Sequence, residues 1–271
     1  MLRDQSIGFI GGGNMGEALI SGLIAASVFP AEKVFAHDVM PSRIQYLEKE
    51  LAIKGRSSIG ELARSSSIIV LAVKPQVISQ VLDALREHLS HKPLVISIAA
   101  GIALSILEGR LPDLTPVVRV MPNAPALVGK GASALSRGKA VSTAQMEMSL
   151  ALFRAVGKAV EVEEKMMDTV TGLSGSGPAY VLLVIEALID AGVLMGLPRQ
   201  TARELVIQTV VGTSMMLEST GKHPAELKDM ITSPGGTSIH GLQLLESYSV
   251  RGALMECVEA ASRRSAELGK G

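Results

Sequence analysis

The sequence has little of what several classes of protein require. It holds one cysteine, Cys257, among 271 residues, so no disulfide can form within the chain and a reducing compartment is expected. Lysine plus arginine (26) equals aspartate plus glutamate (26), so no net charge favours nucleic acid or an anionic membrane surface. These features predict a cytoplasmic protein.

The groups typical of metal-dependent and hydrolytic enzymes are also scarce. The histidines lie far apart, at 37, 88, 91, 223 and 240, without metal-ligand spacing, so we expect no metal site. No Gly-x-Ser-x-Gly turn stands between a strand and a helix in the N-terminal half, which argues against a hydrolase. The longest apolar stretch, 178–195, contains Glu186 and Asp190 and is shorter than the roughly 20 uncharged residues of a spanning helix.

What the sequence does contain begins near its N-terminus. The apolar run 7–10 is typical of a buried strand, and Gly11-x-Gly13-x-x-Gly16 follows it directly, ahead of helix-forming residues. Gly11 would allow a tight turn, Gly13 the approach of a pyrophosphate, and Gly16 close packing of helix on strand. Free N–H groups at the start of the helix favour an anion. The motif predicts a dinucleotide-binding turn; the alternative is an ordinary glycine-rich connection.

The N-terminal half alternates between strand and helix patterns. Strands are predicted at 33–37, 67–73, 94–98, 117–121, 132–135 and 159–162, with helices at 17–26, 76–88 and 143–155. This alternation indicates an α/β fold with a parallel, doubly wound, Rossmann-like sheet.

Asp38 follows the second predicted strand, where a dinucleotide fold meets the adenosine ribose. A carboxylate there would accept hydrogen bonds from the ribose hydroxyls and repel a 2′-phosphate, and Arg43 could offset that repulsion. The alternative is a plain turn residue before Pro41.

From about residue 165 the pattern becomes helical. Helices are predicted at 176–195, 200–218, 224–230 and 250–268. The first is apolar nearly all round and must be buried on every side, which a region of this size cannot achieve alone. We therefore predict a dinucleotide-binding domain, 1–163, and an all-helical domain, 164–271, that forms a homodimer by intercalation of helices. A monomer whose helix is covered by the first domain is the alternative.

Two glycine-rich segments in the helical half are candidate anion sites. Each of 172–178 and 232–238 combines hydroxyl residues with glycines ahead of a helix. Backbone N–H groups of the second could cradle a carboxylate, and its hydroxyls could hold a ring nitrogen. For each segment the alternative is an N-cap with a turn.

Six motifs spread over nearly the whole chain carry a resemblance to a known family. They are FIGGGNMG at 9–16, AVKP at 72–75, RVMPN at 119–123, GLSGSGPAY at 172–180, GLPR at 196–199 and SPGGTSI at 233–239. Together they are similar to the pyrroline-5-carboxylate reductases. The resemblance implies reduction of 1-pyrroline-5-carboxylate to L-proline, the last step of proline biosynthesis, with NADPH or NADH as hydride donor. It also implies at least a homodimer, and a ring of such dimers is a larger assembly that it allows.

The resemblance further implies a set of site residues. Ser238, where members often have threonine, would be the catalytic residue facing the ring nitrogen. The substrate would be bound by Glu164, Ser233, Gly235, Gly236, Thr237 and Ser238. The cofactor would be bound by Ile10, Gly11, Gly12, Gly13, Asn14, Met15, Asp38, Ala72, Val73, Lys74, Pro75, Ile98, Ala99 and Ala100.

The chain departs from the family at the adenosine end. It lacks the asparagine that many members carry near Ile59 and Gly60, and Asp38 stands where NADPH-preferring members have a small or basic residue, so NADH use is expected too. The scarcity of bases agrees with the implied chemistry, because a protonated cyclic imine already accepts a hydride well.

Two other classes of protein share parts of this pattern. A β-hydroxyacid dehydrogenase would need a lysine in the long helix, and 176–195 contains none. A dinucleotide-binding protein without catalysis would not need the intact 233–238 segment. Reduction of other cyclic imines is a third alternative that the sequence leaves open.

Overall fold

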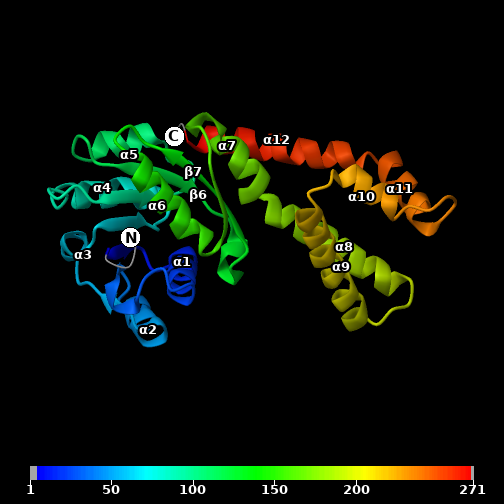
Figure 1. Ribbon diagram of the computed structural model, residues 1–271, viewed down its shortest axis with the longest axis horizontal. Coiled ribbons are helices and arrows are strands. Elements are labelled where there is room, and N and C mark those ends of the chain that lie inside the picture. Colours follow the sequence, from blue (N-terminus) through cyan, green and yellow to red (C-terminus); the bar gives the residue numbers. More distant parts are fainter. Residues whose placement is uncertain (1–4, 270–271) are drawn as a thin grey trace. The chain divides into compact units, whose positions relative to one another are not determined.

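The chain divides into two compact units. The computed structural model describes residues 5–269 (Figure 1). The first unit comprises Met1–Ser176 with Ala260–Gly271, and the second comprises Gly177–Glu259. Each unit has its own architecture.

The first unit is built on one eight-stranded sheet. In sheet order its strands are β3 (Lys54–Gly55), β2 (Val34–His37), β1 (Ile7–Ile10), β4 (Ile68–Leu71), β5 (Leu94–Ser97), β6 (Val117–Met121), β7 (Gly131–Arg137) and β8 (Gly157–Glu161). β1 to β6 run parallel, and β1 pairs with β2 on one side and β4 on the other. The strand order reverses at β1, which is the switch point at which doubly wound folds bind ligands.

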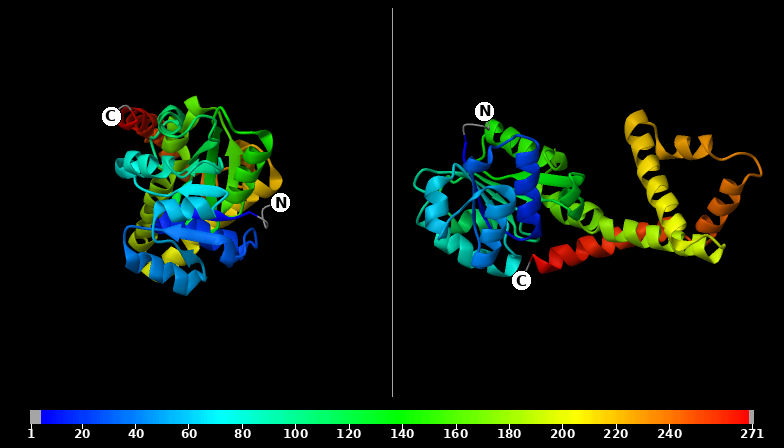
Figure 2. Two further views of the ribbon diagram at one scale, coloured as in Figure 1. Left: turned by 90° about the vertical axis from the view of Figure 1, so that its left-hand side faces the viewer. Right: turned by 90° about the horizontal axis from the view of Figure 1, so that it is seen from below.

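Helices cover both faces of this sheet (Figure 2). They are α1 (Asn14–Ala25), α2 (Pro41–Leu51), α3 (Ile59–Ser65), α4 (Ile78–Arg86), α5 (Leu104–Arg110) and α6 (Thr143–Arg154). Leu19 of α1, Leu47 of α2 and Leu150 of α6 belong to one buried apolar cluster. Leu62 of α3, Leu82 of α4 and Leu107 of α5 belong to the other. The apolar strands are therefore buried on both faces, as parallel sheets require.

The sheet differs from the all-parallel prediction in its last two strands. β7 runs antiparallel to β6, and β8 runs parallel to β7. The reason is the length of the connection: between β6 and β7 the chain has only the segment 122–130, with the short helix η3 (Ala124–Val128). A parallel crossover needs a dozen or more residues, so the chain turns back instead.

The glycine-rich segment 172–178 is also not the turn that the sequence predicted. Residues Glu164–Leu194 form one helical run, in which a π-helical turn, Thr171–Gly175, joins α7 (Met167–Val170) to α8 (Gly177–Leu194). The N–H of Ser176 donates to the carbonyl of Thr171 at 2.8 Å, one residue wider than an α-helical bond. No free helix N-terminus exists there, so the expected anion site at this segment is wrong.

The second unit is entirely helical. It holds α8, α9 (Arg199–Thr220), α10 (Pro224–Met230), α11 (Thr237–Ser247) and the first part of α12 (Val250–Leu268). α8 and α9 pack as an antiparallel pair, and Gly192 lets them approach, because a Cβ there would lie 2.9 Å from the Ala202 Cβ. The absence of strands beyond residue 165 is as predicted, within the described residues 165–269.

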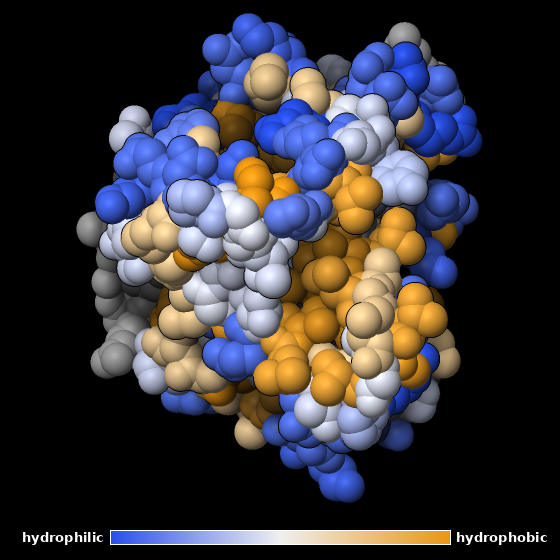
Figure 3. Space-filling view, turned by 90° about the vertical axis from the view of Figure 1, so that its right-hand side faces the viewer, coloured by the Kyte–Doolittle hydropathy of each residue, from blue (hydrophilic) through white to orange (hydrophobic). Residues whose placement is uncertain are grey.

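Large apolar side chains of the second unit are exposed in the single chain. Leu182 and Leu183 of α8 are 63% and 66% exposed, and Leu205 and Met215 of α9 are 55% and 63% exposed. The space-filling view in Figure 3, with the right-hand side of Figure 1 toward the viewer, shows a broad apolar surface. Glu164–Leu194 is long and apolar enough to cross a membrane, a test that core helices of soluble proteins also pass. Exposed apolar surface of this extent marks an interaction surface.

Gly157 provides a test of the strand pairing at β8. Its φ is +148°, and an added Cβ would lie 2.0 Å from the carbonyl oxygen of Gly131 in β7. We expect Gly157→Ala to lower the free energy of unfolding by about 3 kcal/mol or more, because backbone strain and a backbone clash act together. Denaturant unfolding measures this.

Gly109→Ala is the matched control. Gly109 lies in α5 and its added Cβ would have no neighbour within 4 Å. Alanine in a helix is favoured over glycine, so stability should be unchanged or higher by ~0.5–1 kcal/mol. Equal stability of the two variants would contradict the assigned geometry.

Candidate functional site

The glycine turn lies at the carboxyl end of the central strand β1. Gly11 has φ +101°, its N–H donates to the carbonyl of His37 at 2.8 Å, and a Cβ there would lie 2.5 Å from the carbonyl oxygen of Ala72. A Cβ at Gly16 would lie 2.6 Å from the carbonyl oxygen of Gly11. Both glycines are therefore required by the close approach of backbone.

Gly13 differs from both, because open space surrounds it. It is the N-cap of α1, in extended conformation and without a side-chain cap, and an added Cβ would meet nothing within 4 Å. The first N–H groups of α1 are thus not covered by a capping side chain, and the dipole of the helix favours an anion beside them. This open cradle fits a pyrophosphate.

The parallel register brings the other predicted cofactor residues to the same edge of the sheet. Ile10 pairs with His37 of β2 and with Leu71 of β4, and Leu71 pairs with Ser97 of β5. Each of these residues ends its strand. The predicted residues that follow these strand ends are Gly11–Met15, Asp38, Ala72–Pro75 and Ile98–Ala100, and they lie along one edge of the first unit.

Asp38 uses both carboxylate oxygens on the backbone. Its Oδ2 accepts from the N–H of Gly12 at 2.7 Å, and its Oδ1 accepts from the N–H of Met40 at 2.9 Å. Arg43 donates to the carbonyl of Gly12 and to Glu17, and its guanidinium lies 4.8 Å from the ring of Tyr46. Asp38 therefore both turns the chain after β2 and places its charge beside the glycine turn.

A hollow of about 290 Å³ opens beside Asp38 at the carboxyl end of β2. Arg56 and Ser57 line its opposite side. The Arg56 guanidinium stacks on the ring of Phe35 at 4.1 Å, which fixes its direction. The Ser57 hydroxyl and N–H donate to Glu61 at 2.7 and 2.9 Å, and these bonds hold the pKa of the Glu61 carboxyl below its usual range. The sequence analysis did not single out Arg56 as a candidate for this hollow.

At the carboxyl ends of β5 and β6, Glu164 meets a buried arginine. Its Oε1 accepts from the N–H of Leu104 at 2.6 Å and from Arg119 at 3.2 Å. Arg119 is only 8% exposed. The sequence predicted Glu164 but not Arg119, whose signal was a single charge within the apolar strand Val117–Met121.

The predicted substrate segment lies in the second unit, at the start of α11. Gly235 has φ +68°, and the N–H of Gly236 donates to the carbonyl of Ser233 at 3.1 Å, which forms a tight turn. Gly236 is the N-cap, without a side-chain cap, and Thr237 and Ser238 occupy the exposed first turn of the helix. The open N–H groups suit a carboxylate. Ser233, Gly235, Gly236, Thr237 and Ser238 thus share one short element, whereas Glu164 and the cofactor residues belong to the first unit.

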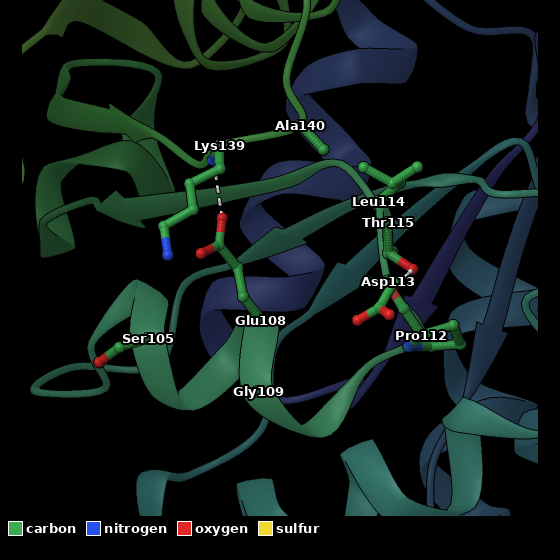
Figure 4. A pocket seen from close by; sticks show the side chains of 9 residues that line it. All are labelled: Ser105, Glu108, Gly109, Pro112, Asp113, Leu114, Thr115, Lys139 and Ala140. Atoms are coloured by element: carbon green, nitrogen blue, oxygen red, sulfur yellow. Dashed lines mark hydrogen bonds between the residues drawn. The ribbon is translucent and has the colours of Figure 1, made fainter.

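Another hollow lies away from the glycine turn. A cavity of about 620 Å³ is bordered by α5, by the segment 112–115 and by Lys139 and Ala140 (Figure 4). The backbone N–H of Lys139 donates to Glu108 at 2.7 Å across it. It lies at the amino end of β6 and not at the carboxyl edge that carries the glycine turn. This hollow is therefore separate from the candidate cofactor site.

Comparisons with known proteins agree with the motifs. The family model "Pyrroline-5-carboxylate reductase dimerisation" matches residues 164–268, and "NADP oxidoreductase coenzyme F420-dependent" matches residues 6–101. The chain is 47% identical over 269 residues to the pyrroline-5-carboxylate reductase of Methanosarcina acetivorans, covering 99% of this chain and 100% of the relative. The chain belongs to the pyrroline-5-carboxylate reductase family.

Two further relatives extend the likeness. The pyrroline-5-carboxylate reductase of Synechocystis sp. is 47% identical, with 97% of this chain and 98% of that protein covered. The solved structure of Plasmodium falciparum pyrroline carboxylate reductase, with NADP bound, has a TM-score of 0.89 and 38% identity, and covers 99% of this chain and 100% of that chain. The predicted Rossmann-like domain with a helical dimerisation region is therefore confirmed for this pyrroline-5-carboxylate reductase family member.

The open cradle at Gly13 generates a prediction. Gly13→Ala should leave the unfolding temperature unchanged, because the added methyl group meets no protein atom within 4 Å. It should raise the Kd for the reduced nicotinamide cofactor about tenfold or more, because the methyl group would occupy the pyrophosphate position. Thermal unfolding and fluorescence titration measure the two effects.

Gly11→Ala provides the contrast. At φ +101° and 2.5 Å from the Ala72 carbonyl, this change should lower the unfolding temperature. If Gly13→Ala bound the cofactor as tightly as the unchanged protein, the cradle would not hold the pyrophosphate.

Proposed function

We propose that this chain catalyses the reduction of 1-pyrroline-5-carboxylate to L-proline by hydride transfer from NADPH or NADH to the C=N carbon, the final step of proline biosynthesis. Membership of the reductase family over the full length of the chain carries this proposal. The geometry supports it, because each half of the chain offers an uncapped helix start suited to an anion, one at Gly13 and one at Gly236.

We assign the cofactor to the carboxyl edge of the first unit. The stretch Ile10–Met15 would hold the pyrophosphate, and Asp38 would face the adenosine ribose. Residues 72–75 and 98–100 would flank the nicotinamide, and the small residues Ala99, Ala100 and Gly101 would allow a flat ring to approach the backbone. When bound, the cofactor supplies a hydride.

We assign the substrate carboxylate to Ser233–Thr237. The N–H groups at the start of α11 would neutralise it, with the Ser238 hydroxyl facing the ring nitrogen. Glu164 would line the same site. A protonated imine accepts a hydride without further activation, so these residues act mainly by placing it. The ring nitrogen keeps its proton as the C=N bond becomes C–N, and a second proton reaches the product amine from water or through Ser238.

The wider organisation is part of the same proposal. We assign the dinucleotide-binding domain to 1–163 and the substrate and dimerisation domain to 164–271. The exposed apolar side chains of α8 and α9 would be covered by a second copy through intercalated helices. The soluble enzyme would act in the cytoplasm, where a lone cysteine stays reduced.

The assay of the purified protein tests the function. NADPH or NADH should be oxidised only when 1-pyrroline-5-carboxylate is added. No turnover with either cofactor would refute the activity. A β-hydroxy acid with NAD⁺ should give no reaction, and turnover of that pair would favour the dehydrogenase alternative instead.

Ser238→Ala should lower kcat/KM for the imine about 10- to 100-fold, because one hydrogen-bonding group at the reacting nitrogen is lost. Cofactor affinity should stay within about twofold. Ser238→Thr keeps the hydroxyl and should keep most of the activity. Ser247→Ala, at the other end of α11, is the control. A rate for Ser238→Ala equal to that of the control would remove the assigned role.

Asp38→Asn should shift cofactor preference toward NADPH. The amide can keep the oxygen that accepts from Gly12, but it loses the acceptor for the Met40 N–H, and the negative charge that repels a 2′-phosphate is gone. We expect the ratio of kcat/KM for NADPH to that for NADH to rise about tenfold. Asp113→Asn, which changes an exposed carboxylate away from the glycine turn, is the control. An unchanged ratio would leave Asp38 as a turn residue only.

A further inference from the structure

Three buried polar side chains lie side by side across the sheet near the carboxyl end of β6. Ser97 of β5 pairs with Arg119 of β6, and Arg119 pairs with Ser136 of β7, so the three side chains share one face. They are 0%, 8% and 1% exposed, respectively. A guanidinium at this depth has lost most of its hydration and requires a counter-charge.

Glu164 supplies that counter-charge in a defined orientation. A single oxygen, Oε1, accepts both from Arg119 at 3.2 Å and from the N–H of Leu104 at 2.6 Å. Two donors on one oxygen fix the plane of the carboxylate. The second oxygen, Oε2, has no hydrogen-bond partner among residues 5–269, and the Glu164 side chain is 36% exposed. The arrangement therefore restrains the carboxylate through one oxygen and leaves the other available to a ligand.

Neighbouring contacts hold the backbone that carries Glu164. Asn123, two residues beyond β6, donates from Nδ2 to the carbonyl of Ser174 at 2.9 Å, and its Oδ1 accepts from the N–H of Ala132 at 2.8 Å. Gly175 lies against Met121, because a Cβ there would be 2.6 Å from the Met121 methyl group. The carboxyl end of β6 therefore binds the helical segment 164–175 at more than one point.

We propose that Arg119 is a positioning residue, which acts through Glu164 by holding its Oε2 toward the substrate. This inference rests on the proposed function, since Glu164 is assigned there to the substrate site. Burial argues against direct contact between Arg119 and a substrate, because its side chain is only 10% exposed and its guanidinium donates to Glu164. Without Arg119, the Glu164 carboxylate would keep its charge and lose its direction.

The test is a double-mutant cycle read as separate kinetic constants. Arg119→Met should raise KM for 1-pyrroline-5-carboxylate about tenfold and leave KM for the cofactor within about twofold. Glu164→Gln keeps the oxygen that Leu104 and Arg119 use and changes only the outward group, so it should raise the same KM. The double variant should be no worse than the worse single variant, because both changes remove one interaction.

Arg119→Lys keeps the buried charge, and its KM should lie between those of the unchanged protein and Arg119→Met. If Arg119→Met does not fold, Arg119→Lys alone tests the inference. A KM of Arg119→Lys equal to that of the unchanged protein would then overturn it. Arg110→Met is the matched control, because it removes an exposed arginine from a pair with Asp83 in the same unit and should leave both KM values unchanged.

The outcomes separate the two proposals. No turnover by the unchanged protein refutes the proposed function and this inference with it. An unchanged KM for Glu164→Gln refutes the role of Glu164, and therefore that of Arg119. Two results would refute the positioning role alone. One is a raised KM for the imine in Glu164→Gln with an unchanged KM in Arg119→Met. The other is a double variant in which the two increases in KM multiply. A rise of both KM values with a lower unfolding temperature would make Arg119 merely structural.

Discussion

The middle of this chain depends on Pro178, whose backbone nitrogen carries no hydrogen. Pro178 lies within the helical run Glu164–Leu194 and cannot donate to the carbonyl four residues earlier, which belongs to Ser174. The helix widens into a π turn just before it, and Asn123 donates to the orphaned carbonyl at 2.9 Å. Because Asn123 follows β6, this bond ties the helix to the sheet at the edge where the candidate site lies. Glu164 begins the helical run that is attached in this way, so its position relative to the sheet is linked to this bond.

Strand register brings the other candidate site residues of the first unit to the same edge of the sheet. The carboxyl ends of parallel neighbouring strands lie at the same edge of a sheet. Because β1 lies between β2 and β4, the ends of these two strands flank the glycine turn. The turn itself is fixed by sterics, since Gly11 touches the backbone after β4. Asp38 joins this arrangement by bonding to Gly12, so the group proposed to face the ribose also holds the phosphate-side loop. If Asp38 faces the ribose as proposed, cofactor choice and loop geometry would be coupled in this chain.

Local features were predictable and long-range ones were not. The strand at 117–121 and the helices at 224–230 and 250–268 occur with the predicted bounds, because burial and periodicity are written in consecutive residues. The seven-residue helices α3 and α5 are too short for such a signal. The reversal of β7 follows from connection length, and the π turn follows from Pro178 and Asn123 together. In the site, Gly11 and Gly13 could be predicted because they belong to a local motif. Arg119 could not, because its ion pair is with Glu164, which is distant in sequence.

The second unit has an energetic consequence of its own. Ala202 and Leu227 are its buried apolar residues among those described, whereas Leu182, Leu183 and many others are largely exposed. A single chain thus gains little hydrophobic free energy from ordering Gly177–Glu259, while the conformational entropy cost of ordering it is undiminished. The first unit, with two apolar clusters on opposite faces of its sheet, has no such deficit. Since residues 164–268 match a dimerisation model, the missing burial would come from a second copy, and stability of the helical half should then rise with protein concentration while that of the sheet should not. Because the proposed substrate turn at Gly235 lies in that half, assembly and substrate binding would share one energetic source.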